Sequence, residues 1–185
     1  MTQVKIEVLP MTFNDVDATS TVHLKAFKGY MNASLGKNYV KRFVSWFLED
    51  DRGIAIVAKC DNKTIGYLLG AQLGYDSDLN KALLKTGIRA ILTHPGILVH
   101  PHFLRTIRLR IKLLLGKNKK ATKDFKEPTG KGVSLVGIAS DPTSGVKGTG
   151  KALIQAFTET AIVQKYNFMR LSVYEENTVA RGLYE

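Results

Sequence analysis

The sequence predicts one mixed α/β domain over residues 1–185, with an insert at about residues 74–132. Short apolar runs of strand length alternate with longer stretches of helical spacing along the chain. Hydrophobic residues make up 44% of the 185 residues, which is enough for a sizeable core. Near the C-terminal end, a glycine-rich turn separates a buried strand from a helix. These three observations favour an α/β domain over a disordered chain.

The part before the insert is predicted to hold three strands and two helices. We first expect a strand with Val4, Ile6 and Val8, and then a helix that is capped by Asn14 or Asp15 and ends near Phe27. A loop over Gly29–Gly36 leads to a second helix over Lys37–Leu48. Two strands follow, over Ile54–Lys59 and Thr64–Leu73. Asp61 and Asn62 predict a hairpin turn between the last two strands. The second helix has an aromatic stripe, which favours core packing over a cofactor-binding role: Tyr39, Phe43, Trp46 and Phe47.

The insert holds the whole excess of positive charge. Residues 81–126 contain 12 Lys or Arg and one acidic residue, whereas the rest of the chain contains 15 of each. Two stretches within the insert have apolar residues at helical spacing, one ending near Thr93 and one over about His102–Leu115. Such basic amphipathic stretches pack on the domain, bind an anionic partner or lie on an anionic membrane surface, so segment 81–126 is a candidate membrane contact. Nucleic acid is disfavoured, since Phe103 and Phe125 are the only aromatic residues there for base stacking.

Cysteine content and the N-terminal sequence bear on the compartment. Cys60 is the single cysteine and lies in an apolar run, IAIVAKC, which favours a small structural residue over a nucleophile. The N-terminus lacks the basic start and long apolar stretch of a signal peptide. These features predict a cytoplasmic protein, with peripheral membrane contact as an option.

The segment with the clearest chemistry is IASDPTSGVKGTGK, residues 138–151. Here a predicted strand, Val133–Ala139, is followed by glycines and a predicted helix, Lys147–Lys165. Backbone N–H groups at a helix start lack partners and attract anions, and glycines let a phosphate come close. The P-loop pattern does not fit, because Ala152 follows Lys151 where Ser or Thr is required. An ordinary glycine-rich turn before a helix is the alternative.

Read as a unit, Val133–Glu185 resembles the GCN5-related N-acetyltransferase family. That family has [Q/R]-x-x-G-x-[G/A] after a strand, then a helix, a strand and a second helix that opens with Asn and carries Ala and Tyr. The corresponding residues here are GVKGTG at 145–150, a predicted strand Met169–Val173, and Asn177, Ala180 and Tyr184 in LSVYEENTVARGLYE. The order and spacing of these pieces are more specific than the glycines alone.

The resemblance implies a mixed, mostly antiparallel central sheet flanked by helices and an acetyl-CoA-dependent acyltransferase. The acceptor amine then attacks the thioester directly, with no covalent enzyme intermediate. The resemblance also assigns roles: the backbone of Ile138 and Ala139 to the pantetheine arm, the N–H groups of Val146, Lys147, Gly148, Thr149, Gly150 and Lys151 to the pyrophosphate, Asn177 to the cofactor arm or to a helix cap, and Tyr184 to protonation of the leaving thiolate. It implies no metal.

Two departures from the family pattern accompany this resemblance. Gly145 replaces the usual Gln or Arg, which removes one side-chain contact. Family members continue beyond the position of Glu185 with two more strands, so a C-terminal strand pair is predicted to be missing from this sequence. The sheet edge left open then needs a cover, for which a homodimer is one option.

The general base and the acceptor remain open at this stage. The base candidates are Glu175 and Glu176 after the last strand and Glu49, Asp50 and Asp51 after the second helix. The stretch AFKGYMNASLGKNYVKRF also resembles family members linked to bacterial surface-polysaccharide synthesis. That second resemblance implies an amino-sugar acceptor, whereas a non-enzymatic binding module with a membrane-contacting insert is the alternative.

Overall fold

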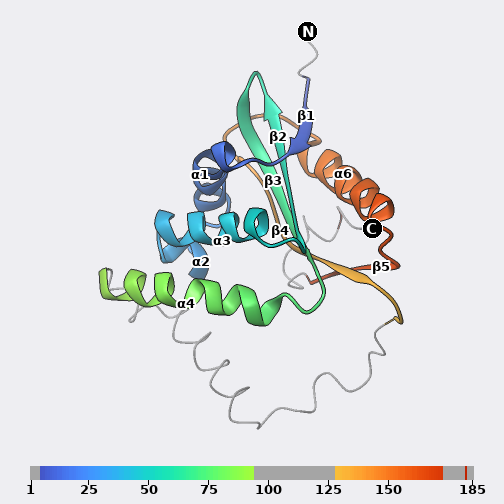
Figure 1. Ribbon diagram of the computed structural model, residues 1–185. Helices are drawn as coiled ribbons and strands as arrows, with labels where there is room; N and C mark the ends of the chain where they lie inside the picture. The colour runs from blue at the N-terminus through green and yellow to red at the C-terminus, as the bar shows by residue number, and fades with distance from the viewer. Residues whose placement is uncertain (1–4, 94–127, 173–181, 183–185) are drawn as a thin grey trace.

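The computed structural model describes residues 5–93, 128–172 and 182, and it has a five-stranded sheet with helices on both faces (Figure 1). The elements before the insert are β1 (Glu7–Pro10), the 3-10 helix η1 (Phe13–Asp15), α1 (Val16–Ala26), α2 (Met31–Ser34), α3 (Lys37–Glu49), β2 (Gly53–Cys60) and β3 (Lys63–Gln72). They are followed by α4 (Asp76–Thr93), β4 (Gly132–Ser140), α6 (Thr149–Val163) and β5 (Phe168–Leu171). The predicted mixed, mostly antiparallel sheet is confirmed.

The strands follow chain order across the sheet, β1-β2-β3-β4-β5. All neighbours are antiparallel except β4 and β5, which are parallel. In the β3–β4 pairing, Leu69 is opposite Gly137 while Gly70 is opposite Leu135, so Val136 is an extra residue on β4. This β-bulge bends β4 in its middle, and it divides the half that pairs with β5 from the half that does not.

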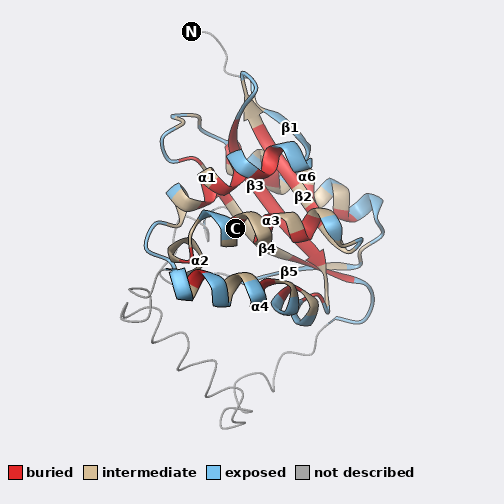
Figure 2. Cartoon of the chain, turned by 60° about the vertical axis from the view of Figure 1, so that its left-hand side comes forward, coloured by how far each residue is buried: buried red, intermediate tan, exposed pale blue. Residues whose placement is uncertain are grey.

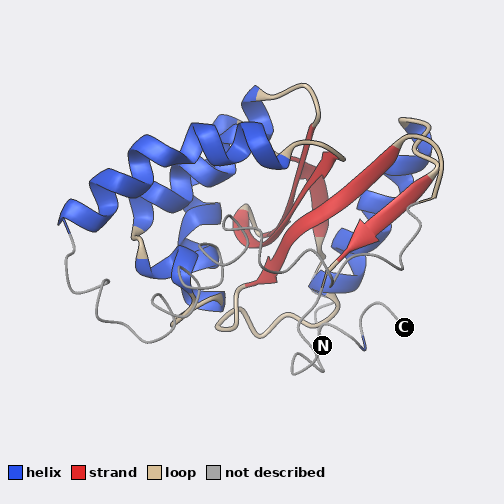
Figure 3. Ribbon diagram, turned by 90° about the horizontal axis from the view of Figure 1, so that it is seen from below, coloured by secondary structure: helices blue, strands red, loops and turns tan. Residues whose placement is uncertain are grey.

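Helices α1, α3 and α4 cover one face of the sheet and α6 covers the other (Figure 3). Alternate side chains of β3 serve the two faces: Tyr67 and Leu69 pack with α1 and α3, whereas Leu68 packs with α6. The buried residues form a band along β2, β3 and the inner helix faces (Figure 2). The predicted aromatic stripe of α3 lies in this core, with Phe43, Trp46 and Phe47 buried.

Two predictions near the N-terminal helices need correction. Asp15 is at the N-cap position of α1 as expected, but its side chain makes no cap bond. Its carboxylate instead accepts hydrogen bonds from the backbone N–H and hydroxyl of Thr12 and pairs with Lys59 at 2.6 Å. The predicted loop Gly29–Gly36 contains the single-turn helix α2, because Ser34 bonds back to the Tyr30 carbonyl through both its N–H and its hydroxyl.

The hairpin turn between β2 and β3 is confirmed. Asp61 and Asn62 both have positive φ, 48° and 61°, the pattern of a type I′ turn.

Replacing Asn62 with alanine is therefore expected to lower the free energy of unfolding by about 1 kcal/mol, because alanine lacks the tolerance of asparagine for left-handed backbone. Asn62→Gly is the control, since glycine adopts this conformation freely. Urea denaturation of both variants measures the difference. Equal losses of unfolding free energy in Asn62→Ala and Asn62→Gly would contradict the assignment of a type I′ turn.

The insert begins after β3 and ends at β4, and these two points are neighbours in the sheet. The Leu73 N–H donates to the Gly132 carbonyl at 3.0 Å, so the two ends of the insert are hydrogen-bonded to each other. The first predicted helical stretch is confirmed as α4, which packs on α3 through Leu79 and Leu83. The second stretch, at about 102–115, lies outside the described residues. In the part that is described, no helix is both long and apolar enough to cross a bilayer.

Cys60 lies at the end of β2, partly exposed, and packs against the core beside α6. Burial raises the pKa of the Cys60 thiol above its usual value, and the neighbouring Asp61 raises it further. A raised pKa disfavours the reactive thiolate, which agrees with a structural residue.

Candidate functional site

The candidate site starts at the edge of β4 that faces β5. The two strands pair only from Gly132 to Leu135 on β4, and β4 then continues to Ser140. Within residues 128–172, no strand pairs with this edge of β4 after Leu135. An extended chain can form main-chain hydrogen bonds with such an edge.

The β3–β4 register decides which backbone groups of β4 face that edge. The Asp141 N–H donates to the Ile65 carbonyl at 2.7 Å, and the Ala139 carbonyl lies 3.0 Å from a Cβ built on Gly66, so both point toward β3. Backbone groups alternate in direction along an antiparallel strand. Ile138 and Ser140 therefore direct their N–H and C=O groups to the open edge. Of the two residues predicted for the pantetheine arm, Ile138 fits this role and Ala139 does not face the edge.

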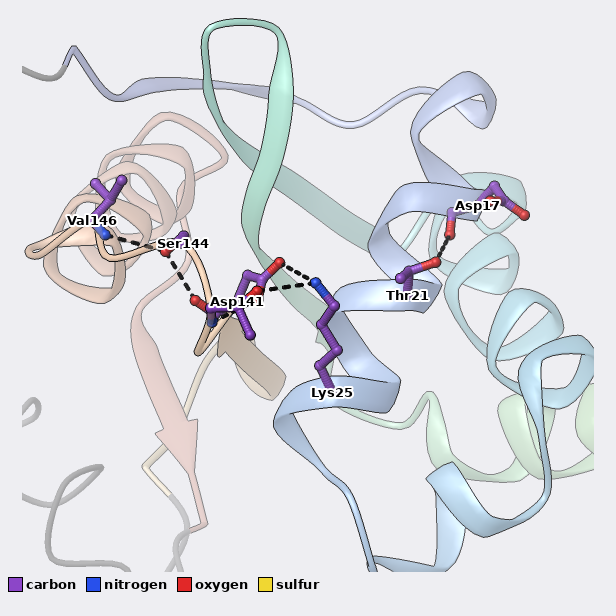
Figure 4. Close-up of polar contacts among 7 residues, drawn as sticks. Asp17, Thr21, Lys25, Asp141, Ser144 and Val146 are labelled. Atoms are coloured by element: carbon purple, nitrogen blue, oxygen red, sulfur yellow. Dashed lines mark hydrogen bonds and ion pairs between the residues drawn. The ribbon is translucent and has the colours of Figure 1, made fainter.

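A fixed turn joins β4 to α6, and the buried Asp141 organises it (Figure 4). One carboxylate oxygen of Asp141 accepts hydrogen bonds from the Thr143 N–H at 2.9 Å and the Thr143 hydroxyl at 2.6 Å. The other oxygen forms an ion pair with the Lys25 ammonium of α1 at 2.8 Å. The Ser144 hydroxyl then donates to the Asp141 carbonyl and accepts from the Val146 N–H. These hydrogen bonds hold the backbone from Asp141 to Val146 in one conformation.

The electrostatics of this turn agree with its geometry. The hydrogen bond from Lys25 lowers the pKa of the Asp141 carboxyl to about 2, with further lowering by Thr143. Asp141 is therefore ionised at neutral pH. Its charge is neutralised by Lys25, which leaves the turn without a net negative charge that would repel an anion.

Helix α6 begins directly after this turn. Gly148 is its N-cap residue and has the left-handed φ of 86°, with open space where a side chain would project. Among the described residues, the backbone N–H groups of residues 147–151 have no hydrogen-bond partner. These groups and the positive end of the helix dipole form a cradle suited to a phosphate. Hereafter, "the cradle" means residues 146–151.

The cradle is docked on the sheet through Thr149. Thr149 is buried, and its methyl carbon lies only 2.7 Å from a Cβ built on Gly66 of β3, so only glycine fits there. The Thr149 side chain thus faces the core, and only its backbone N–H can serve a ligand. Lys147 and Lys151 are exposed at the rim of the cradle, where both can add positive charge.

The other predicted site residues divide into two groups. Asn177, Tyr184, Glu175 and Glu176 lie outside the described residues, so their assignments stay predictions. Two of the base candidates after α3 are bound to arginines: Glu49 to Arg42 and Asp50 to Arg52. The hydrogen bond from Arg52 lowers the pKa of the Asp50 carboxyl, which disfavours Asp50 as a proton acceptor. In the ranges 5–93 and 128–172, no group of three or more His, Cys, Asp or Glu residues is arranged to hold a metal ion.

The sequence did not indicate two parts of the site region. One is Lys25, which is 116 residues from its partner Asp141 in the chain. The other is the buried pair of His23 and Tyr67, in which the imidazole Nδ1 and the phenol oxygen are 2.5 Å apart. Tyr67 is opposite Ala139 in the β3–β4 register, so this pair lies under the strand that borders the site. No sequence motif connects the two residues; the apolar positions around Tyr67 are the only hint that it is buried.

Comparison with solved structures identifies the fold. The aminoglycoside N-acetyltransferase AAC(6')-Iy in complex with CoA superposes with a TM-score of 0.62 at 12% identity, covering 98% of this chain and 86% of its own. A possible acetyltransferase from Clostridium difficile 630 gives 0.59 at 15% identity, covering 98% and 88%. The ribosomal-protein-alanine N-acetyltransferase from Brucella melitensis biovar Abortus 2308 gives 0.54 at 12%, covering 97% and 88%. No protein-family model matches the sequence, and no curated protein does.

The chain has the GCN5-related N-acetyltransferase fold. At these identities the likeness concerns the fold, and it agrees with the resemblance seen in Val133–Glu185. In this chain, the bulge of β4, the open edge of that strand and the cradle follow one another in sequence.

Proposed function

We propose that the protein is an acetyl-CoA-dependent N-acetyltransferase that transfers an acetyl group to a small amine by direct attack. The observation that carries this proposal is the continuity of the open β4 edge with the cradle. Ile138 offers main-chain groups for the pantetheine arm, and the N–H groups of residues 147–151 lie one turn further along for the pyrophosphate. Solved structures with this fold include one bound to CoA and one bound to a bisubstrate analogue of CoA, which supports the same donor.

In the proposed mechanism the neutral amine attacks the thioester carbon, the C–N bond forms and the C–S bond breaks. The departing thiolate takes a proton from Tyr184, a step that is chemically reasonable because phenols and thiols are of comparable basicity. The amine loses one proton to a base and then to solvent, and Tyr184 regains one from solvent, so the protein returns to its starting protonation state. Acetylated product and CoA then leave the protein.

For the acceptor we propose an amino sugar that carries an anionic group. Aminoglycoside acetyltransferases are among the solved structures that superpose on this chain. Aminoglycosides are polycations, however, and this chain has a formal net charge of +11. An amino sugar linked to a phosphate or diphosphate matches that charge better, because the protein's field attracts it.

Calorimetry with acetyl-CoA tests the donor half of the proposal with a matched pair of glycine variants. Gly148→Val is expected to weaken binding, because valine strains the left-handed backbone and projects into the cradle. Gly36→Val is the control: Gly36 is also a helix N-cap, with φ 84° and open space around its Cβ position, but it precedes α3. Both variants should lose similar stability, whereas only Gly148→Val should lose affinity. A wild-type protein that does not bind acetyl-CoA would overturn the proposal.

Release of free thiol from acetyl-CoA in the presence of an amine panel tests the acyl transfer. Turnover is expected with amino sugars that carry phosphate, and Tyr184→Phe should slow it without changing acetyl-CoA affinity. Binding of acetyl-CoA without turnover on any amine would favour a non-enzymatic binding module instead.

A further inference from the structure

Helix α4 has two apolar faces, and the described part of the protein covers only one of them. Leu79, Leu83 and Ala90 face the protein core and are buried. On the opposite side, Leu84, Ile88 and Leu92 are 61%, 52% and 76% exposed. They recur every four residues, so they form one stripe about 12 Å long. Hereafter, "the α4 stripe" means these three residues. Figure 2 shows this outer side of α4 at the margin of the described part of the protein.

Basic residues border the α4 stripe along its whole length. Lys81, Lys85 and Arg89 also recur every four residues and are exposed. Lys81 is within 3.5 Å of Asp78, in the first turn of the helix. Neither Lys85 nor Arg89 has an acidic partner within the described part of the chain. The outer face of α4 therefore combines exposed apolar side chains with positive charge.

We propose that the outer face of α4 docks on an anionic lipid bilayer surface. The three apolar side chains enter the boundary between headgroups and acyl chains, and the basic side chains contact the headgroup phosphates. In this arrangement the axis of α4 lies in the plane of the bilayer.

Charge argues against the other candidates for this face. A second copy of the chain would bring Lys85 and Arg89 close to the same residues of its partner, and like charges repel. The chain that follows α4, residues 94–127, has nine basic and two acidic residues, so its net charge repels Lys85 and Arg89. A nucleic acid would match the charge, but it would not bury the three exposed aliphatic side chains. This face also has no aromatic residue on which bases could stack.

Docking through α4 leaves the candidate donor site free. Helix α4 follows the end of β3 that pairs with the start of β4, at Gln72 and Val133. The cradle follows the other end of β4, at Ser140. The proposed lipid-facing helix and the cradle thus lie toward opposite ends of the sheet (Figure 1). Acetyl-CoA can reach the cradle from solution while the protein is on a bilayer.

Co-sedimentation of the full chain with lipid vesicles tests this proposal. The protein is expected to bind vesicles of phosphatidylcholine mixed with phosphatidylglycerol, to bind pure phosphatidylcholine weakly, and to lose binding as NaCl is added. The triple variant Leu84→Gln, Ile88→Gln, Leu92→Gln should lower the partition coefficient about tenfold or more. The matched control is Ile162→Gln with Val163→Gln: these two residues of α6 are 69% and 80% exposed, but α6 covers the opposite face of the sheet from α4. This variant should bind like the wild type.

A second variant keeps the test valid if the triple variant fails to fold. Lys85→Gln with Arg89→Gln removes charge from exposed positions and should lower the partition coefficient on anionic vesicles about tenfold. Circular dichroism and acetyl-CoA binding check that each variant is folded. The proposal is overturned by a wild type that does not bind anionic vesicles, or by a folded triple variant that binds them unchanged. It is also overturned by a wild-type dimer that the triple variant loses, because a second copy would then cover the α4 stripe.

Discussion

Replacing Asp141 with alanine is expected to weaken acetyl-CoA binding by about tenfold or more and to lower the free energy of unfolding by about 3 kcal/mol. The carboxylate of Asp141 is buried and accepts hydrogen bonds from Lys25 and from two groups of Thr143. Without it, the Thr143 N–H and hydroxyl lose their acceptor, and α1 loses its only ion pair to the turn among the described residues. The 3.2 Å hydrogen bond from the Lys25 ammonium to the Thr143 hydroxyl is then what still joins the two. The backbone that leads to the cradle is then no longer held in one conformation, and preorganisation is lost.

Calorimetry with acetyl-CoA and urea denaturation measure the two effects of the Asp141 substitution. Asp51→Ala is the control, because Asp51 is an exposed aspartate in the turn before β2. Asp141→Asn separates shape from charge: the amide oxygen can still accept from Thr143, but the ion pair with Lys25 is lost. It should lose less affinity than the alanine variant. Loss of stability with unchanged affinity in Asp141→Ala would show that the turn supports the fold and not the cradle.

The stability that Asp141 contributes through this turn is expected to fall on acidification. The pKa of Asp141 is lowered to about 2, with the Lys25 hydrogen bond as the main cause. A lowered folded-state pKa means that the stabilisation is present above the ordinary carboxyl pKa and is lost as the pH falls toward 2. The contribution of Asp141 is therefore constant through the neutral range.

Because of His23, the free energy of unfolding is expected to be about 3 kcal/mol lower at pH 4 than at pH 7. Burial lowers the pKa of His23 from 6.5 to about 4. In the unfolded chain the imidazole takes up its proton near pH 6.5, whereas in the folded protein it resists protonation until about pH 4. The unfolded state thus binds more protons in this window, so stability falls as the pH falls.

The surroundings of His23 explain why its charged form is disfavoured. Rings of Phe27, Phe43 and Tyr67 pack against the imidazole. Its Nδ1 bonds to the Tyr67 hydroxyl, while its Nε2 is buried without a hydrogen-bond partner among the described residues. An imidazolium needs acceptors for both N–H groups, and this site offers one.

Urea denaturation at several pH values tests the role of His23. His23→Gln should flatten the dependence of stability on pH between 7 and 4, because glutamine does not titrate. Tyr67→Phe is the control: it removes the hydroxyl but leaves the histidine buried, so the slope should persist. Equal slopes in the wild type and in His23→Gln would assign the acid sensitivity to other groups.

The sequence was informative wherever a local pattern decides the structure. Alternation and apolar runs located β2, β3 and β4 to within one or two residues, and Asp61-Asn62 specified its turn through the backbone preferences of those two residues. The cradle followed from glycines placed between a strand and a helix. The Lys25–Asp141 pair could not be predicted in this way, because only the packing of α1 beside the end of β4 brings the two residues together. Asp15 shows the same limit: its sequence position suggests a cap, but Lys59 from β2 draws its carboxylate elsewhere.

The hydrogen bond between Leu73 and Gly132 has a consequence for how such a chain can change over generations. It closes the insert at its base, so residues 74–131 begin and end at adjacent points of the sheet. Lengthening a chain that is already closed at its ends adds little entropic cost, since that cost grows only with the logarithm of loop length. Insertions, deletions and charge changes beyond α4 can therefore accumulate without moving β3 against β4. The proposed donor site and the segment beyond α4 are, in this sense, free to diverge separately.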